Sequence, residues 1–231
     1  VVVVVWYMRK KREFLRQRFF QQINRVRMEN LRSRISPHFT FNVLGREINQ
    51  FNGSEEVKHN LMELVKYLRR SLELTEKLSV SLQDELDFVR TYIELERGRV
   101  GEDFVATVTV EDGLDATRIM IPSMIVQISV ENAIKHGLAG KDGKKELMVY
   151  VSRETNGIRI TVTDNGRGYL PQVVSATRGT GTGLKVLYQT IQLLNTKNKS
   201  DKIRFNITNR SDGQTGTEVS VYIPFRFSYD L

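Results

Sequence analysis

The sequence has 231 residues, of which 40% are hydrophobic, with 16 glycines and only 4 prolines, so it is globular material rather than a disordered chain. It contains no cysteine, which excludes disulfides and thiolate metal sites and is typical of a reducing cytoplasm. The net charge of +8 lies in one segment, because residues 1–34 hold ten Lys or Arg and two acids, whereas residues 35–231 hold 25 residues of each sign.

Residues 1–12 read VVVVVWYMRKKR. Five valines are too few to cross a bilayer, which takes about 20 apolar residues. A valine run, then two aromatic residues, then four basic ones is nevertheless the order found where a transmembrane helix enters the cytoplasm. We therefore expect residues 1–8 to end a transmembrane helix and the rest to lie on the cytoplasmic side of the inner or cytoplasmic membrane. The alternative is a basic arm that binds nucleic acid, which the balanced charge of the remaining residues disfavours.

The first hundred residues carry apolar side chains at helical spacing. One long helix is predicted over residues 9–51, with a turn at residues 51–56 in which Ser54 caps the next helix. Two further helices are predicted, and their apolar stripes are Val57, Leu61, Leu64, Val65, Leu68 and Leu72 in one, and Leu82, Leu86, Val89 and Ile93 in the other. Two antiparallel helices with one stripe each cannot enclose a core, so a homodimeric four-helix bundle is expected. The alternative is that the stripes pack on the C-terminal part of the chain.

From about residue 100 the period changes from helical to alternating. Helices are expected near residues 122–138, opened by Pro122, and near residues 184–195. The five predicted strands are at residues 104–110, 147–151, 158–163, 202–208 and 217–223. This order indicates an α+β sandwich in which helices cover one face of a mixed sheet.

Three stretches of this C-terminal half carry chemistry. On the predicted helix, Asn132, Lys135 and His136 lie about one turn apart. The amide oxygen of Asn132 is a good ligand for a magnesium ion that already carries phosphates. The ammonium group of Lys135 can bind phosphate. Asp164 ends a strand in TVTDNGRGYL and can accept the amino hydrogen of adenine, whereas guanine presents an oxygen there. The alternatives without a function are an amphipathic helix with a polar face for the Asn132 stretch and a simple turn at DNG for the Asp164 stretch.

The third stretch is TRGTGTGLKVLYQ, beginning at residue 177, in which Gly179, Gly181 and Gly183 lead into a helix. Glycines before a helix N-terminus favour anion binding through free N–H groups and the helix dipole. The spacing fits neither a Walker A loop nor a dinucleotide fingerprint, and a flexible loop alone would look similar.

The order of these stretches resembles the nucleotide-binding domain of the family that includes gyrase, Hsp90, histidine kinases and MutL. PHFTFN at residues 37–42 together with ENAIKHG at residues 131–137 resembles the LytS-type sensor histidine kinases. The resemblance implies Mg-ATP as cofactor, a response regulator receiver domain as partner, and His38 as the phosphorylated residue. It also implies the following nucleotide site: Asn132 on the metal, Asp164, Gly166 and Gly168 around adenine, and Gly179, Gly181 and Gly183 in a lid over the phosphates. From their place on the Asn132 helix, Lys135 and His136 are expected to join this nucleotide site.

The acceptor segment fits this role physically. Histidine has an ordinary pKa of about 6.5, so much of it is a neutral nucleophile near pH 7. Pro37 removes a helical hydrogen bond, and a kink there would expose the imidazole of His38. Arg34 precedes His38 by one turn and suits a phosphate oxygen. Asn42, one turn after His38, either orients a water for dephosphorylating the partner or pins the kinked backbone.

Two departures from related kinases and ATPases matter. Many histidine kinases carry an acid directly after the acceptor, whereas this chain has Phe39, so a carboxylate that orients His38 must come from elsewhere, with Glu131 as a candidate. ATP-hydrolysing relatives carry a glutamate four residues before the metal asparagine, and this chain has Ile128 there. A kinase is favoured over an ATP hydrolase of the same fold or an ATP-binding dimeric scaffold.

The predicted organisation has four segments. They are the end of a transmembrane helix at residues 1–8, a juxtamembrane signalling helix at 9–36, dimerisation and phosphotransfer helices at 37–99, and a catalytic ATP-binding domain at 100–231.

Overall fold

The computed structural model describes residues 6, 10–11, 55–169, 182–196, 198 and 200–229. The predicted acceptor segment with Arg34, Pro37, His38 and Asn42, the cap at Ser54, and the glycines at 179 and 181 lie outside these residues. Within the described ranges, none of the helices is both long and apolar enough to span a bilayer. The predicted end of a transmembrane helix, of which Trp6 is described, stays a prediction.

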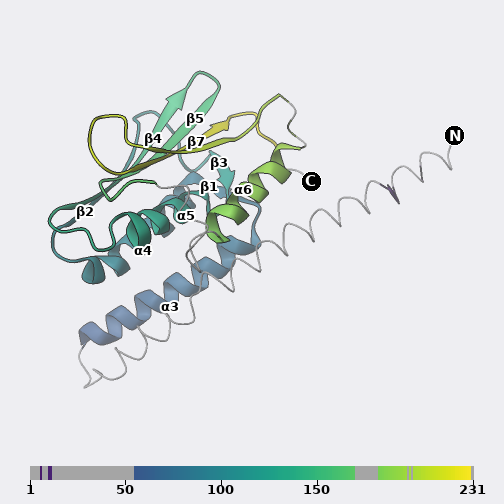
Figure 1. The fold of residues 1–231 in the computed structure, drawn as a ribbon. Coiled ribbons are helices and arrows are strands. Elements are labelled where there is room, and N and C mark those ends of the chain that lie inside the picture. Colours follow the sequence, from purple (N-terminus) through teal and green to yellow (C-terminus); the bar gives the residue numbers. More distant parts are fainter. Residues whose placement is uncertain are drawn as a thin grey trace.

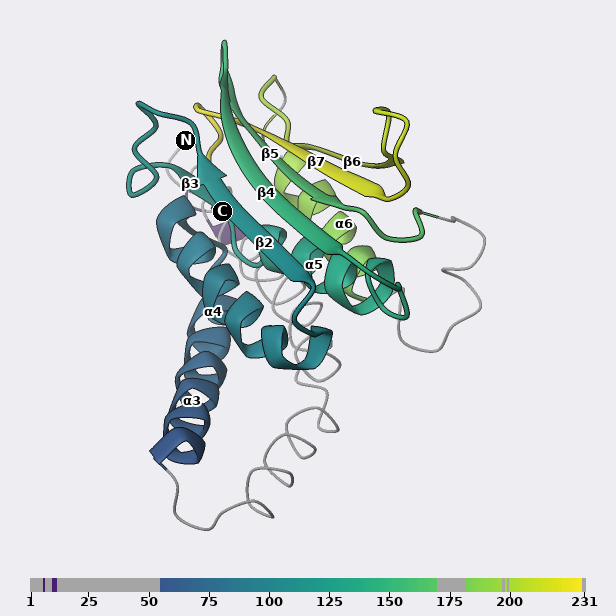
Figure 2. The ribbon, with the colours of Figure 1, turned by 90° about the vertical axis from the view of Figure 1, so that its left-hand side faces the viewer.

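Two long helices open the described body. Helix α3 covers Glu55–Glu76 and α4 covers Leu82–Val100, so both are longer than the apolar stripes that predicted them. Ser81 caps α4 by accepting a hydrogen bond from the Asp84 backbone nitrogen, and it donates its hydroxyl to the Asp84 carboxylate. This reciprocal cap explains why the helix begins directly after a short strand. Figures 1 and 2 show α3 projecting away from the body that the sheet and the other helices form.

The main sheet has five strands in the order β2-β4-β5-β7-β6. Its first pair, β2 with β4, is parallel and the other pairs are antiparallel, which confirms the predicted mixed sheet. The strand bounds are Phe104–Val110 for β2, Lys145–Glu154 for β4, Gly157–Asp164 for β5, Arg204–Asn209 for β6 and Thr217–Pro224 for β7. All five strands were predicted, with ends that differ by up to three residues.

Two short strands were not predicted. Strand β1, Ser79–Ser81, pairs antiparallel with β3, Met120–Pro122, in a separate two-stranded sheet. Pro122 was expected to open a helix, and this prediction is wrong: Pro122 ends β3, and helix α5 begins at Ile125. The pairing joins residues about 40 positions apart, which local sequence signals do not reveal.

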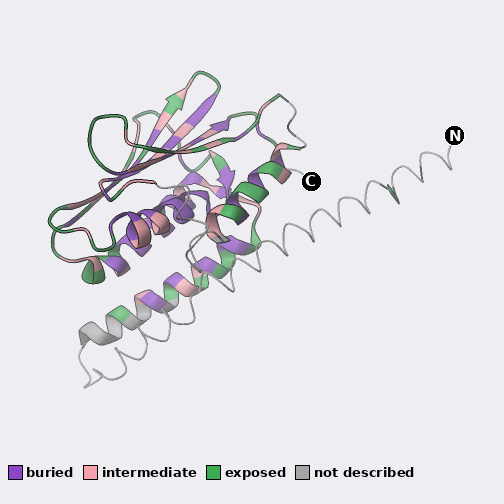
Figure 3. Ribbon diagram, in the orientation of Figure 1, coloured by how far each residue is buried: buried purple, intermediate pink, exposed green. Residues whose placement is uncertain are grey.

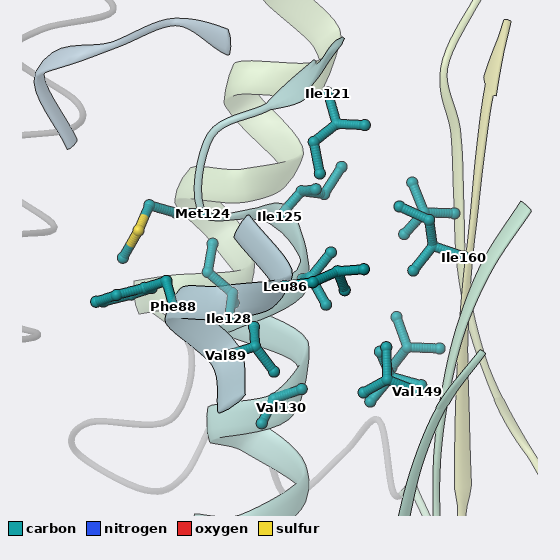
Figure 4. Packing of buried hydrophobic residues seen from close by; sticks show 14 of the residues in the cluster. Leu86, Phe88, Val89, Ile121, Met124, Ile125, Ile128, Val130, Val149 and Ile160 are labelled. Carbon is teal, nitrogen blue, oxygen red and sulfur yellow. The ribbon is translucent and has the colours of Figure 1, made fainter. Parts of the chain in front are cut away.

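Helices α4, α5 (Ile125–Asn132) and α6 (Thr182–Asn195) lie on one side of the five-stranded sheet. Figure 4 shows Leu86, Val89 and Ile128 on the helical side of the core, with Val149 and Ile160 facing them from the sheet. One hydrophobic cluster contains residues from α3, α4, α5, α6 and the sheet. The structure therefore has the expected α+β architecture with helices over one face.

The apolar stripe of α4 settles one alternative that the sequence left open. Leu82, Leu86, Val89 and Ile93 are all buried within the single chain, and α4 packs against α5 and β2 as well as α3. This stripe therefore covers the sheet domain. On α3, by contrast, Leu72 remains 48% exposed, so the expected pairing of two copies through that helix stays a prediction. The boundary placed at residue 100 also stays a prediction.

Candidate functional site

The site is built around α5, which is buried along almost its whole length (Figure 3). After Asn132 the helix continues as a π turn over Ala133–Gly137, in which the Leu138 nitrogen donates to the Ala133 oxygen at 2.8 Å. Single π turns occur frequently at functional sites, because they widen the helix locally and redirect side chains. The wider turn also means that Asn132, Lys135 and His136 do not follow the regular helical spacing that the sequence analysis assumed.

Asn132 has a defined orientation at the start of this turn. Its side-chain nitrogen donates to the Ile128 carbonyl oxygen at 2.8 Å. Only the nitrogen of an amide can donate to a carbonyl, so the amide oxygen points away from the helix backbone. An oriented neutral oxygen of this kind is what a hard divalent cation with phosphate ligands requires from the protein.

Lys135 is held by its own helix. Its Nζ donates to the Glu131 carboxylate at 3.2 Å and lies 5.9 Å from the centre of the Tyr92 ring. Glu131 also accepts a hydrogen bond from Gln127 at 3.1 Å. The Lys135 ammonium, with a side chain 35% exposed, therefore has to leave or share Glu131 before it can contact a phosphate.

His136 lies half-buried in the π turn. Burial lowers the pKa of its imidazole, and the positive charges of Lys135 and Arg167 lower it further. The ring is therefore neutral near pH 7. Arg167, from the loop after β5, donates to the His136 carbonyl oxygen at 2.9 Å, which ties the DNGRG segment to the π turn.

Asp164 ends β5 and is only 3% exposed. One carboxylate oxygen accepts hydrogen bonds from the backbone nitrogens of Gly166, at 2.8 Å, and Thr217, at 3.4 Å. Burial raises the pKa of this carboxyl, while those hydrogen bonds and the charge of Arg210 act in the opposite direction. The Thr217 side chain also hydrogen-bonds this carboxyl, and because a carboxylate has about four acceptor positions it can still accept a hydrogen bond from a polar ligand.

Glycines allow the π turn and the end of β5 to touch. A Cβ on Gly137 would lie 2.7 Å from an Asp164 carboxylate oxygen, and one on Gly166 would lie 2.1 Å from the Gly137 carbonyl oxygen. Gly216, at φ +139°, approaches so closely that a Cβ would lie 1.9 Å from the Asp164 carbonyl oxygen. The absence of side chains here is a packing requirement, because real Cβ atoms do not approach so closely.

The structure thus brings two of the three predicted stretches together. The Asn132 helix and the DNGRG segment meet at Gly137 and Gly166, although 29 positions separate these glycines. Gly168, at φ +85°, keeps the loop in a left-handed conformation, and a Cβ there would lie 2.7 Å from the Asn209 side chain.

The third stretch is described only from α6 onward. Gly183 lies in the first turn of this helix, and α6 packs against α5. The residues that α6 buries are Val186, Leu187, Thr190, Ile191 and Leu194. The roles predicted for Gly179, Gly181 and Gly183 remain predictions.

Sequence reasoning missed several residues of this site. Gly137 stood at the end of ENAIKHG without a role, Gly216 stood directly before a predicted strand, and Thr217 was the first residue of that strand. A glycine directly preceding an alternating run was the available signal for Gly216. The contact of Gly137 with Asp164 had no local signal, because the two positions are joined only by the fold.

Two family models match the chain over most of its length. The model described as histidine kinase matches residues 26–104, and the model described as histidine kinase-, DNA gyrase B- and HSP90-like ATPase matches residues 117–226. Together they cover the predicted acceptor segment, helices α3, α4, α5 and α6 and strands β4 to β7, whereas most of β2 lies between the two matches.

Two curated proteins illustrate the similarity. The chain is 28% identical over 205 residues to the sensor histidine kinase YpdA of Escherichia coli, covering 88% of this chain and 35% of that protein. It is 32% identical over 197 residues to the sensor histidine kinase/phosphatase LytS of Staphylococcus aureus, covering 81% of this chain and 33% of that protein. The chain thus spans about a third of the length of these relatives.

Among solved structures, the histidine kinase domain of the blue-light activated histidine kinase EL346 from Erythrobacter litoralis aligns with a TM-score of 0.48 and 16% identity. The alignment covers 89% of this chain and 94% of that one.

Proposed function

The chain belongs to the histidine kinase family, and we propose that it is the kinase part of a sensor histidine kinase of a two-component system. In this proposal the γ-phosphoryl group of ATP passes to His38 and then to an aspartate on the receiver domain of a response regulator. The observation that carries it is the junction at which Gly137 and Gly166 hold the Asn132 helix against the buried carboxylate of Asp164.

The residues present fit ATP and a magnesium ion. The adenine amino group would donate to the Asp164 carboxylate, which Gly166 and Thr217 hold in place through their backbone nitrogens. Among the described residues there is no group of three or more His, Cys, Asp or Glu side chains that could hold a metal. The ion would therefore be shared between the Asn132 oxygen and phosphate oxygens, where it neutralises charge.

The transfer itself needs positioning and charge neutralisation more than covalent chemistry from the protein. A neutral ring nitrogen of His38 forms a bond to the γ-phosphorus, the bond from that phosphorus to the bridging oxygen breaks, and ADP leaves. Lys135 and Arg34 would neutralise charge on the phosphate oxygens, with Lys135 moving from Glu131. In the described structure Glu131 is engaged by Gln127 and Lys135, so its alternative role in orienting His38 would require both contacts to change.

The partners follow from the same proposal. A second copy would pack on α3, where Leu72 is 48% exposed, to form the dimeric bundle. The valine, aromatic and basic order of residues 1–12 favours attachment to a membrane upstream, with this chain on the cytoplasmic side. Removal of phosphate from the regulator, with Asn42 orienting a water, is proposed as a second activity, because the Staphylococcus aureus relative is named a kinase/phosphatase.

A competing function is ATP hydrolysis by the same fold. Ile128, four residues before Asn132, is 3% exposed and carries no base, and a kinase benefits from not activating water. With magnesium and ATP, we expect phosphate to accumulate on the protein up to a stoichiometric limit, with little steady release of inorganic phosphate. Continuous release without protein-bound phosphate, measured by a coupled phosphate assay, would favour the hydrolase.

The glycine contact gives a sharp test of the nucleotide site. Gly137→Ala would place a methyl group 2.7 Å from the Asp164 carboxylate, which must then shift away from Gly166 and Thr217. We expect ATP affinity to fall by about tenfold or more, the cost of one hydrogen bond, measured by isothermal titration calorimetry. Gly98→Ala is the matched control, because nothing lies within 4 Å of its Cβ position. Equal affinities for both variants would contradict the proposed adenine site.

A further inference from the structure

The first turn of α5 lacks the usual local caps. The N-cap position is Met124, which has a positive φ of 69° and makes no side-chain hydrogen bond to the helix, and the first turn has no acidic residue. A helix start exposes backbone N–H groups and a positive end of the dipole, and both need a partner when buried. The residues here are buried, with Ile125, Val126 and Gln127 at most 1% exposed.

Glu85 supplies the missing cap from another helix. It lies on α4, is fully buried at 0% exposure, and accepts three backbone hydrogen bonds at the start of α5. One carboxylate oxygen accepts from Met124 at 2.9 Å, and the other accepts from Val126 at 3.1 Å and Gln127 at 3.2 Å. Hydrogen bonds to an ionised acceptor are the strong ones. Three of them on one rigid carboxylate fix both the position and the rotation of the helix start.

The same junction is also tied to the end of α3. Ser123 donates its hydroxyl to the Leu74 carbonyl oxygen and its backbone nitrogen to the Leu78 oxygen, the latter at 3.2 Å. The start of α5 is therefore held between α3 and α4.

Asn132 is the last residue of this eight-residue helix. A helix of that length is about 12 Å long and behaves as a rigid rod. A rotation at Ile125 therefore displaces the amide oxygen of Asn132, while Asp164, on β5, keeps its backbone partners. The metal side of the site thus lies on α5 and the adenine side on β5, and the two meet where the π turn touches Gly166 and Arg167.

We propose that Glu85 is a positioning residue for the nucleotide site, which acts by fixing α5 so that the Asn132 oxygen meets a magnesium ion on the phosphates. This inference rests on the proposed function. One property distinguishes this positioning role from that of a purely structural cap: Glu85 controls the magnesium-dependent part of ATP affinity and leaves the magnesium-independent part unchanged.

The test measures ATP affinity of the 231-residue chain by calorimetry in magnesium and in EDTA, well below the unfolding temperature of each variant. In Glu85→Gln an amide nitrogen faces one of the three N–H donors. We expect the gain in affinity from magnesium to fall by about 10- to 100-fold, the usual cost of losing a group that orients a metal ligand, while affinity in EDTA stays at the wild-type value. Glu96→Gln is the matched control, since Glu96 is a 1% exposed glutamate on the same helix that pairs with Arg99 instead.

Every possible result of this test either supports or overturns the proposed role of Glu85. A folded Glu85→Gln variant with the wild-type gain from magnesium would overturn the inference, and so would an equal loss in Glu96→Gln. If Glu85→Gln does not fold, Glu85→Asp decides by the same ratio, because its shorter side chain keeps the charge but cannot reach all three donors. Wild-type protein that binds ATP without any gain from magnesium would instead refute the metal role of Asn132, and the inference with it.

Discussion

Replacing His38 with glutamine is expected to abolish protein phosphorylation while ATP binding remains. Glutamine is polar and of similar size but has no ring nitrogen to bond phosphorus, whereas the proposed nucleotide contacts come from α5 and β5. Incorporation of labelled phosphate should fall to background, and ATP affinity should stay within about twofold of wild type, as for independent sites.

The chain offers a matched control, because it has only three histidines. His59→Gln makes the same chemical change and should leave phosphorylation at the wild-type level. Label that persists in His38→Gln and disappears in His59→Gln would assign the acceptor to His59 and contradict the motif-based assignment.

The second large effect is expected from Asp164→Asn, which should reverse the preference between ATP and GTP. The backbone nitrogens of Gly166 and Thr217 both donate to one Asp164 oxygen. An asparagine must therefore keep its oxygen on that side and turn its amide nitrogen toward the base. That nitrogen faces the adenine amino group, with no acceptor between them, whereas it can donate to the guanine carbonyl.

We expect ATP affinity to fall by about 10- to 150-fold, the cost of losing a hydrogen bond to a charged group, and GTP affinity to rise above that of wild type. Competitive titration of both nucleotides measures this ratio. Asp112→Asn, an exposed substitution, should change neither affinity. An unchanged preference in Asp164→Asn would show that the base does not contact this carboxylate.

Local sequence patterns predicted the parts of the site that depend on local structure. Asp164 followed an alternating run and preceded two glycines, so a carboxylate at a strand end was predictable, and the structure places it there. The alternating runs themselves gave all five strands of the main sheet, since a half-buried strand needs one apolar face.

Local sequence patterns could not predict the contacts between segments that lie far apart in the chain. Met124 and Glu85 are 39 positions apart, and nothing near either residue indicates that one caps the helix that the other begins. The π turn at Ala133–Gly137 has no distinct residue signal, because the same side chains suit an α-helix. Pro122 looked like a helix start, but its pairing with Ser79 across a strand ladder decided its conformation.

The most direct test of the account is the chemistry of the phosphorylated protein. The full chain would be incubated with magnesium and γ-labelled ATP, and the labelled protein would then be treated with acid and with alkali. Phosphate on His38 should be lost in acid and survive alkali, as a phosphorus–nitrogen bond on histidine requires. Label that survives acid, or no label on a protein that binds ATP, would contradict it.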